Sequence, residues 1–244
     1  MTRELSAALR ALLEEEGAGP QGRNVHLEER MLISLDVETG GLDAEANPLL
    51  QVSLWRPDGP GYEVRIKGDP ARCHPRALQA NGLDPTQGME PADAAASLVQ
   101  WWKSIDSPQF HLIGQNVGPF DVPFLKQLTK VGVDVPWSMM FDYHYRDTGT
   151  LALALQDAGI LHFGKWSLTN ICQVLGILYD PHICRADAKA AWYAWHRMQE
   201  VLMHLRDNNN VIEGHSKEGC SGIDQTREIN HSLRAHLPAL DLRG

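Results

Sequence analysis

The order of apolar segments between residues 31 and 205 constrains the fold more than any other feature of the sequence. Three short apolar runs come first, and the turn Pro-Asp-Gly-Pro-Gly separates the last two. This spacing predicts adjacent antiparallel strands at 31–37, 50–55 and 62–67. Strands then alternate with helices. We expect strands at 110–115 and 141–146 and helices at 91–105, 122–131, 148–158, 168–175 and 186–205. This order predicts an α/β fold with a mixed sheet flanked by helices.

The two ends of the chain have weaker patterns. Apolar residues at helical spacing from Leu5 to Leu13 predict a helix over 3–16, which the glycine-rich stretch at 17–22 ends. This helix either packs on the main body or binds a partner. After Arg206 the pattern fades, and we expect a loop from Asn208 to residue 222 and one short helix within 223–240.

Composition and charge exclude several classes of protein. With 43% hydrophobic and 22% charged residues in a chain of 244, the sequence is of ordinary globular type. The formal charge is −9, from 22 Lys and Arg against 31 Asp and Glu. A protein that coats nucleic acid needs the opposite sign, because Lys and Arg must neutralise phosphates. Any contact with nucleic acid should therefore be local, with bound cations supplying part of the positive charge.

Targeting signals and cysteine pairing give no reason to place the chain outside the cytoplasm. No apolar run approaches the roughly 18 residues of a membrane helix, and the charged N-terminus does not read as a secretory signal. Cys73, Cys172, Cys184 and Cys220 form no C-x-x-C pair, so we expect free thiols in a reducing cytoplasm.

The histidines of the C-terminal part form no recognisable zinc pattern. Five residues there could in principle bind zinc: His204, His215, Cys220, His231 and His236. Their spacing fits no standard arrangement of zinc ligands, which favours scattered surface histidines.

The first segment that suggests chemistry is Ser-Leu-Asp-Val-Glu-Thr-Gly-Gly-Leu, residues 34–42. Asp36 and Glu38 are two positions apart at the end of a predicted strand, so both carboxylates project from the same face. Two such like charges raise each other's pKa unless a cation lies between them, and Mg²⁺ prefers oxygen ligands of this kind. A solvated strand end beside a Gly-Gly turn is the alternative interpretation.

The second segment runs from Gly114 to Leu125, between a predicted strand and a predicted helix. Asp121 falls near the start of that helix, where it could bind metal or serve as an N-cap. Asn116 could form the turn or hold substrate and the backbone of the site. Phe120 and Phe124 are interpreted as core residues.

The third segment opens the last long helix, with His182 just before it and Asp187 in its first turn. Asp187, Ala190, Ala191 and Ala194 share one helical face. Small alanines let this face approach the sheet closely and draw Asp187 inward. An inward carboxylate is costly unless it is paired or binds a metal.

Taken in order, these segments resemble the DEDDh 3′–5′ exonucleases, the DnaQ-like family that includes proofreading exonucleases and RNase T. Residues 36–42 match D-x-E-T-x-G-L, residues 120–125 match F-D-x-x-F-L, and His182 with Asp187 matches H-x-x-x-x-D. The segments 147–152 and 168–172 are also similar to the family. The likeness covers roughly residues 31–205. Asn116 precedes Asp121 by five positions, one more than in the common form of the motif.

The resemblance implies an RNase H-like fold. Its sheet would have five strands in the order 3-2-1-4-5, with strand 2 antiparallel to the others and helices on both faces. It also implies an exonuclease domain over 31–206, preceded by a helical appendage and linker at 1–30 and followed by an extension at 207–244.

The resemblance further implies a site with two Mg²⁺ ions, about 4 Å apart, for which Mn²⁺ could substitute. Asp36, Glu38, Asp121 and Asp187 would bind them, and His182 would take the proton of the attacking water. The terminal nucleotide would be held by Thr39, Gly40, Leu42 and Asn116, although Leu42 could equally be a core residue.

The implied activity is release of nucleoside 5′-monophosphates from the 3′-hydroxyl end of nucleic acid, with single-stranded DNA as the expected substrate. Trimming of RNA 3′ ends is the first alternative, because the motifs do not separate DNA from RNA. A non-catalytic nucleic-acid-binding module on the same fold is the second. A nucleic acid 3′ end is the expected partner and a membrane is not; association with a polymerase or a second copy stays open.

Overall fold

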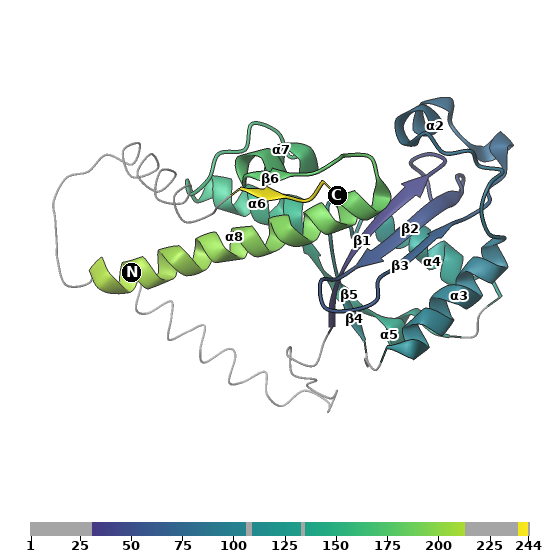
Figure 1. Cartoon of the computed structure of the whole chain (residues 1–244), viewed down its shortest axis with the longest axis horizontal. Helices are drawn as coiled ribbons and strands as arrows, with labels where there is room; N and C mark the ends of the chain where they lie inside the picture. Colours follow the sequence, from purple (N-terminus) through teal and green to yellow (C-terminus); the bar gives the residue numbers. More distant parts are fainter. Residues whose placement is uncertain (1–30, 106–108, 133–134, 213–238, 244) are drawn as a thin grey trace. The chain divides into compact units, whose positions relative to one another are not determined.

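A computed structural model of the chain describes residues 31–105, 109–132, 135–212 and 239–243. Its centre is a five-stranded sheet with the strand order β3-β2-β1-β4-β5 (Figure 1). The strands are β1 (Met31–Thr39), β2 (Leu49–Trp55), β3 (Tyr62–Arg65), β4 (Phe110–Gly114) and β5 (Phe141–Asp147). β2 is antiparallel to both β1 and β3, whereas β1, β4 and β5 are mutually parallel. The mixed sheet, its strand order and its single antiparallel strand are therefore confirmed.

Helices cover both faces of this sheet. They are α2 (Pro75–Asn81), α3 (Pro91–Ser104), α4 (Asp121–Thr129), α5 (Trp137–Met140), α6 (Thr148–Asp157), α7 (Leu168–Val174) and α8 (Cys184–Ile212). A 3-10 turn, η3, spans Pro70–Arg72, and two further short strands, β6 (Ile177–Leu178) and β7 (Leu240–Asp241), pair in parallel. α3 and α4 pack on one face, and α8 packs against β1, β2 and β4 on the other.

The alternation of side chains along β1 assigns each residue to one of these two faces. Ile33, Leu35 and Val37 belong to the apolar core that includes α3 and α4. Successive side chains of a strand point to opposite faces, so Asp36 and Glu38 lie on the face covered by α8. The fold thereby places both acids beneath the helix that carries Asp187.

Several short elements were not expected. Four short elements have no clear hydrophobic period in the sequence: α2, α5, β6 and β7. The two-residue strands β6 and β7 form only by pairing with each other. The loop predicted from Asn208 onward is wrong for its first residues, because α8 continues to Ile212. Extending an existing helix costs little compared with starting one, so the poor helix propensity of three asparagines is overridden.

The terminal predictions are only partly covered by the described residues. The helix expected at 3–16 and the appendage expected at 1–30 lie outside the described residues. Most of the helix expected within 223–240 lies outside them too, and its last residue, Leu240, belongs to β7. The boundary at residue 206 stays a prediction. In the part of the chain that the structure describes, no helix is long and apolar enough to cross a membrane.

Candidate active site

Three carboxylates from distant parts of the sequence meet at one end of the sheet. Asp36 and Glu38 come from β1, and Asp187 comes from the first turn of α8. One carboxylate oxygen from each of the three lies within 4.8 Å of the other two. The half-buried Asp187 sits on the helical face whose Ala190, Ala191 and Ala194 are buried, as the small-residue pattern predicted.

Asp121 lies beside this group, at the start of α4. Its side chain is buried, and its Oδ1 accepts a hydrogen bond of 3.0 Å from the backbone N–H of Val37, between the two acids of β1. Its negative charge contributes to raising the pKa of Asp36. Phe120 occupies the N-cap position and Asp121 is the first helical residue, so an N-cap role for Asp121 is wrong.

His182 stands directly before α8 on the exposed side of the site. Its φ of 66° lies in the left-handed region, which is uncommon for residues other than glycine. Burial raises the pKa of Asp187, whereas a hydrogen bond from the backbone N–H of His182 and a charge on its ring act to lower it. The geometry therefore combines one exposed imidazole with a carboxylate that belongs to the acidic group.

Burial and mutual repulsion make the ionised form of these acids costly. Burial, followed by the charges of Asp121, Asp187 and Glu38, raises the pKa of Asp36 well above its ordinary value. Burial and the charge of Asp187 raise the pKa of Glu38 to about 7. Burial likewise raises the pKa of Asp121. This donor set, made of oxygens that repel one another, fits divalent cations such as Mg²⁺, which prefer oxygen ligands and would offset the repulsion.

A cleft of about 520 Å³ opens over this site. Its lining combines the site with β2, β3 and the end of α2: Glu38, Gln51, Glu63, Val64, Arg65, Asn81, Leu83, His182, Ile183 and Cys184. Glu38 and His182 therefore lie at the wall of a cavity that has room for part of a ligand rather than on a flat surface.

Three residues that sequence reasoning missed support the acids. Asn81 donates through Nδ2 to the carbonyl of Thr39 at 3.1 Å and also bonds the Glu38 side chain. Tyr179 hydrogen bonds to Asp187. The buried Cys184 donates from Sγ to the carbonyl of Asp36 at 3.2 Å. Only Cys184 carried a signal, its place between His182 and Asp187; the other two depend on tertiary packing.

Thr39 and Gly40 form the turn that follows the acids of β1. The buried Thr39 donates from its hydroxyl to the carbonyl of Gly41 at 2.6 Å. A Cβ on Gly40 would approach the side chains of Cys73 and Pro48 to 2.7 Å, so only glycine fits there. Neither residue is among those that line the cleft. Their contact with a terminal nucleotide stays a prediction.

Leu42 and Asn116 also lie outside the lining of the cleft. The Leu42 side chain is 86% exposed, which rules out its alternative interpretation as a core residue. Asn116 has a φ of 56°, a conformation that asparagine tolerates, and its carbonyl accepts from the N–H of Phe120. The turn-forming role of Asn116 is therefore present, whereas its role toward substrate stays a prediction.

Comparisons with known proteins place this geometry in a known fold. No protein-family model matches the sequence, and no curated protein matches it. Solved structures do match. One is E. coli exonuclease I with a 5cy-dT13 oligonucleotide, which has 16% sequence identity and a TM-score of 0.57. The match covers 77% of this chain and 46% of the exonuclease I chain. The same enzyme with a dA16 oligonucleotide matches at 18% identity and a TM-score of 0.56, over 69% of this chain and 40% of its own.

The chain has the exonuclease I fold. This fold agrees with the five-stranded fold that the motif resemblance implies. A complex of exonuclease I with the SSB C-terminus matches at 15% identity and a TM-score of 0.56, over 72% of this chain. The chain spans less than half the length of these exonuclease I chains, between 40% and 46%.

The raised pKa of Glu38 predicts how stability depends on pH. Because the pKa is about 7 in the folded protein and ordinarily 4.5, the folded state binds this proton more tightly between those values. Stability of the metal-free protein should therefore fall as pH rises from 4.5 to 7, by on the order of 1–2 kcal/mol after solvent screening of this half-buried group.

Urea unfolding in a chelator at several pH values would measure this change. Millimolar Mg²⁺ should restore the lost stability at the upper pH, and Glu38→Gln should reduce the dependence by the contribution of this one group. A free energy of unfolding that rises across this window, or that Glu38→Gln leaves unchanged, would contradict the electrostatics described above.

Proposed function

We propose that this chain is a metal-dependent 3′–5′ exonuclease that releases nucleoside 5′-monophosphates, with single-stranded DNA as its preferred substrate. The observation that carries the proposal is the convergence of Asp36, Glu38 and Asp187 within 4.8 Å, with Asp121 alongside. Acids that repel each other in a partly buried site destabilise the fold, so their convergence favours a chemical role. The exonuclease I fold supports the same reading.

The four carboxylates are proposed to hold two divalent ions, Mg²⁺ or Mn²⁺. Ions held there would lower the pKa of a nearby water and offset negative charge at the scissile phosphate. The His182 imidazole, exposed at the mouth of the cleft, accepts a proton from the attacking water as its oxygen bonds to phosphorus. The bond from phosphorus to the 3′ oxygen of the shortened strand breaks, and that oxygen takes a proton from solvent. Asp187, which accepts a hydrogen bond from the backbone N–H of His182, would stabilise the imidazolium in its ionised form.

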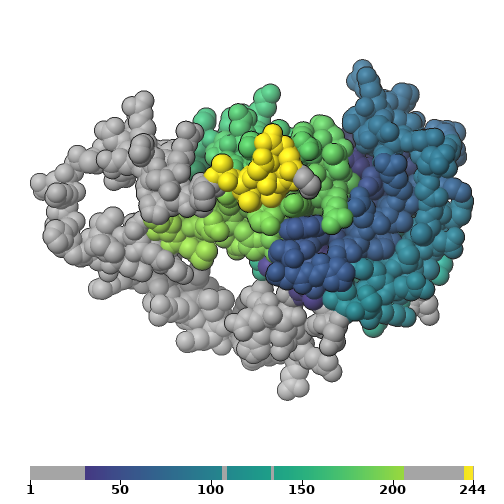
Figure 2. Space-filling view, viewed as in Figure 1, coloured from purple at the N-terminus to yellow at the C-terminus, as the bar shows by residue number. Residues whose placement is uncertain are grey.

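A second hollow next to the cleft suits a single strand. It measures about 510 Å³, shares Ile183 with the cleft, and is lined by Trp55, Arg185, Lys189 and Leu242 among others. It lies where the C-terminal residues, yellow in Figure 2, meet the green first turns of α8. Cationic groups track a phosphate backbone and aromatic rings stack on bases, so this surface could accept the nucleotides that precede the 3′ end.

We propose DNA rather than RNA as the preferred substrate because the structures of exonuclease I contain deoxyoligonucleotides such as dT13 and dA16. The test uses 5′-labelled DNA and RNA oligomers of one sequence, each with a 3′-hydroxyl or a 3′-phosphate. With Mg²⁺, the DNA ending in a hydroxyl should yield a ladder of shortened products and free nucleoside 5′-monophosphates, and the chelator should stop the reaction.

Each alternative has its own outcome in this assay. Faster shortening of the RNA than of the DNA would favour the RNA-trimming enzyme. Binding of both oligomers without release of nucleotides, under Mg²⁺ and under Mn²⁺, would favour the non-catalytic module. Equal degradation of the oligomer that ends in a 3′-phosphate would contradict recognition of a 3′-hydroxyl end.

A further inference from the structure

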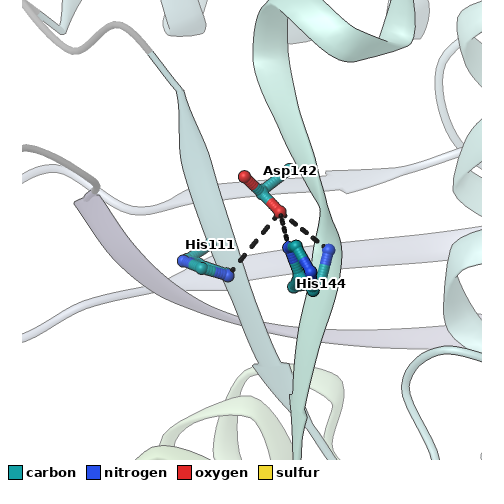
Figure 3. Close-up of side chains that lie close together, drawn as sticks. All are labelled: His111, Asp142 and His144. Atoms are coloured by element: carbon teal, nitrogen blue, oxygen red, sulfur yellow. Dashed lines mark hydrogen bonds and ion pairs between the residues drawn. The ribbon is translucent and has the colours of Figure 1, made fainter. Parts of the chain in front are cut away.

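A second group of metal-ligating side chains lies away from the acidic site, between β4 and β5. Figure 3 shows His111 on β4 pointing toward Asp142 and His144 on β5. His111 pairs in the sheet with Leu32, four positions before Asp36 on β1. At about 3.3 Å per residue, the group lies roughly 13 Å along the strand from the carboxylate site. It is therefore separate from the proposed catalytic centre.

An irregularity in the β4–β5 pairing brings the three side chains together. Phe110 pairs with Phe141 and Leu112 pairs with Tyr145, so the single residue His111 faces three residues of β5. This shift in register leaves two extra residues on β5, and irregularities of this kind re-aim side chains locally. Here it directs both Asp142 and His144 toward His111.

The donor atoms lie close to the spacing of a tetrahedral metal site. Asp142 Oδ1 lies 2.9 Å from His144 Nδ1 and 3.8 Å from His111 Nε2, and one donor atom of each residue lies within 4.8 Å of the other two. Ligands bound tetrahedrally at 2.0–2.1 Å from Zn²⁺ lie about 3.3 Å from one another. The distances of 2.9 and 3.8 Å fall on either side of that value, so small side-chain rotations would close the site around an ion.

The surroundings also suit a bound ion. Asp142 and His111 are buried, whereas the His144 side chain is 58% exposed, which leaves a path for an ion to enter. The backbone N–H of His144 donates to Asp142 Oδ1 at 2.8 Å, and the Tyr143 ring lies 3.8 Å from the His144 ring. Contacts of this kind orient metal ligands from outside the coordination sphere.

We propose that His111, Asp142 and His144 bind one Zn²⁺ ion that fastens the edge strand β5 to β4. Two imidazole nitrogens and one carboxylate oxygen suit zinc, whereas Mg²⁺ prefers oxygen ligands alone. Zinc replaces the hydrogen bond from His144 Nδ1 to Asp142, and the displaced proton leaves to solvent. Three protein ligands leave a fourth position for water.

The test measures zinc bound by the full-length chain in millimolar Mg²⁺, by equilibrium dialysis and by thermal unfolding. His144→Ala removes an exposed ligand without opening a cavity in the core. His162→Ala, at an exposed histidine between α6 and α7, is the matched control. We expect His144→Ala to bind one equivalent less Zn²⁺ than wild type and to lose the zinc-dependent rise in Tm, while His162→Ala behaves as wild type.

Cobalt binding provides a second, spectroscopic test of the same site. Co²⁺ bound tetrahedrally to nitrogen and oxygen ligands has visible absorption bands, which His144→Ala should abolish and Zn²⁺ should displace in wild type. Asp142→Asn is a second variant, useful if His144→Ala folds poorly. Its amide oxygen can still accept the hydrogen bond from the backbone N–H of His144, and its cobalt bands should also be lost. Equal zinc binding by wild type and both variants would overturn the proposal and leave the group a hydrogen-bonded cluster. The nuclease assay is independent of this result, because these residues lie outside the acidic site.

Discussion

Asp36→Asn is expected to lower exonuclease turnover by about 10⁴-fold or more, a larger loss than removal of a general base causes. The Asp36 carboxylate interacts electrostatically with Glu38, Asp121 and Asp187. Its charge should therefore help to hold every ion bound in the site. The amide has nearly the same shape, and the fold should therefore survive. Single-turnover assays with labelled single-stranded DNA, over a range of Mg²⁺ and Mn²⁺ concentrations, would measure the loss.

The same substitution should act in opposite directions on activity and stability. Burial and three neighbouring carboxylates disfavour the charge of Asp36, so the metal-free Asp36→Asn protein should unfold at a higher temperature than wild type at pH 8. Asp58→Asn, an exposed acid in the turn between β2 and β3, is the control that should change neither quantity. A variant that degrades the strand as fast as wild type would refute the assignment of the site.

Replacement of His182 with asparagine is expected to lower turnover by about 10²–10⁴-fold, the usual contribution of a general base. Asparagine tolerates the left-handed conformation that His182 adopts, so the approach to α8 should be preserved. The affinity for Mn²⁺ should stay close to that of wild type, because His182 is proposed to move a proton and not to bind metal. Single-turnover rates and a Mn²⁺ titration would separate the two effects.

Added imidazole provides the complementary experiment. Free imidazole should partly restore turnover of His182→Asn by accepting the proton in place of the missing side chain. His162→Asn, an exposed histidine elsewhere, should be unaffected by the added base. If the His182→Asn protein loses Mn²⁺ affinity in parallel with its rate, His182 supports the metal ligands and is not the base.

The fold was largely predictable because its elements depend on local patterns. The apolar runs of β1, β2 and β4 and the helical spacing of α3, α4 and α8 are encoded in neighbouring residues, and the strand order followed from the family resemblance. The short elements were not predictable. α2, β6 and β7 have little periodicity of their own, yet α2 supplies Asn81 to the cleft and β7 brings Leu242 beside α8.

The candidate site, like the fold, was predictable only in part. That Asp36 and Glu38 share a face follows from the two-residue period of a strand, and that Asp187 turns inward follows from the alanines behind it. The partners of these acids were not visible in the sequence. Tyr179 hydrogen bonds to Asp187 and Asn81 hydrogen bonds to Glu38, and isolated contacts of this kind leave no periodic signal.

The sequence by itself determined which residues are candidates for the chemistry, where the main strands and helices lie, and which face each acid occupies, because these depend on residue type and local spacing. Only the tertiary structure decided that three acids meet within 4.8 Å, that burial raises the pKa of Glu38 to about 7, and that an irregularity in the β4–β5 pairing gathers His111, Asp142 and His144. Distances between remote segments and the solvation of a charge are set by packing of the whole chain, and no local pattern encodes them.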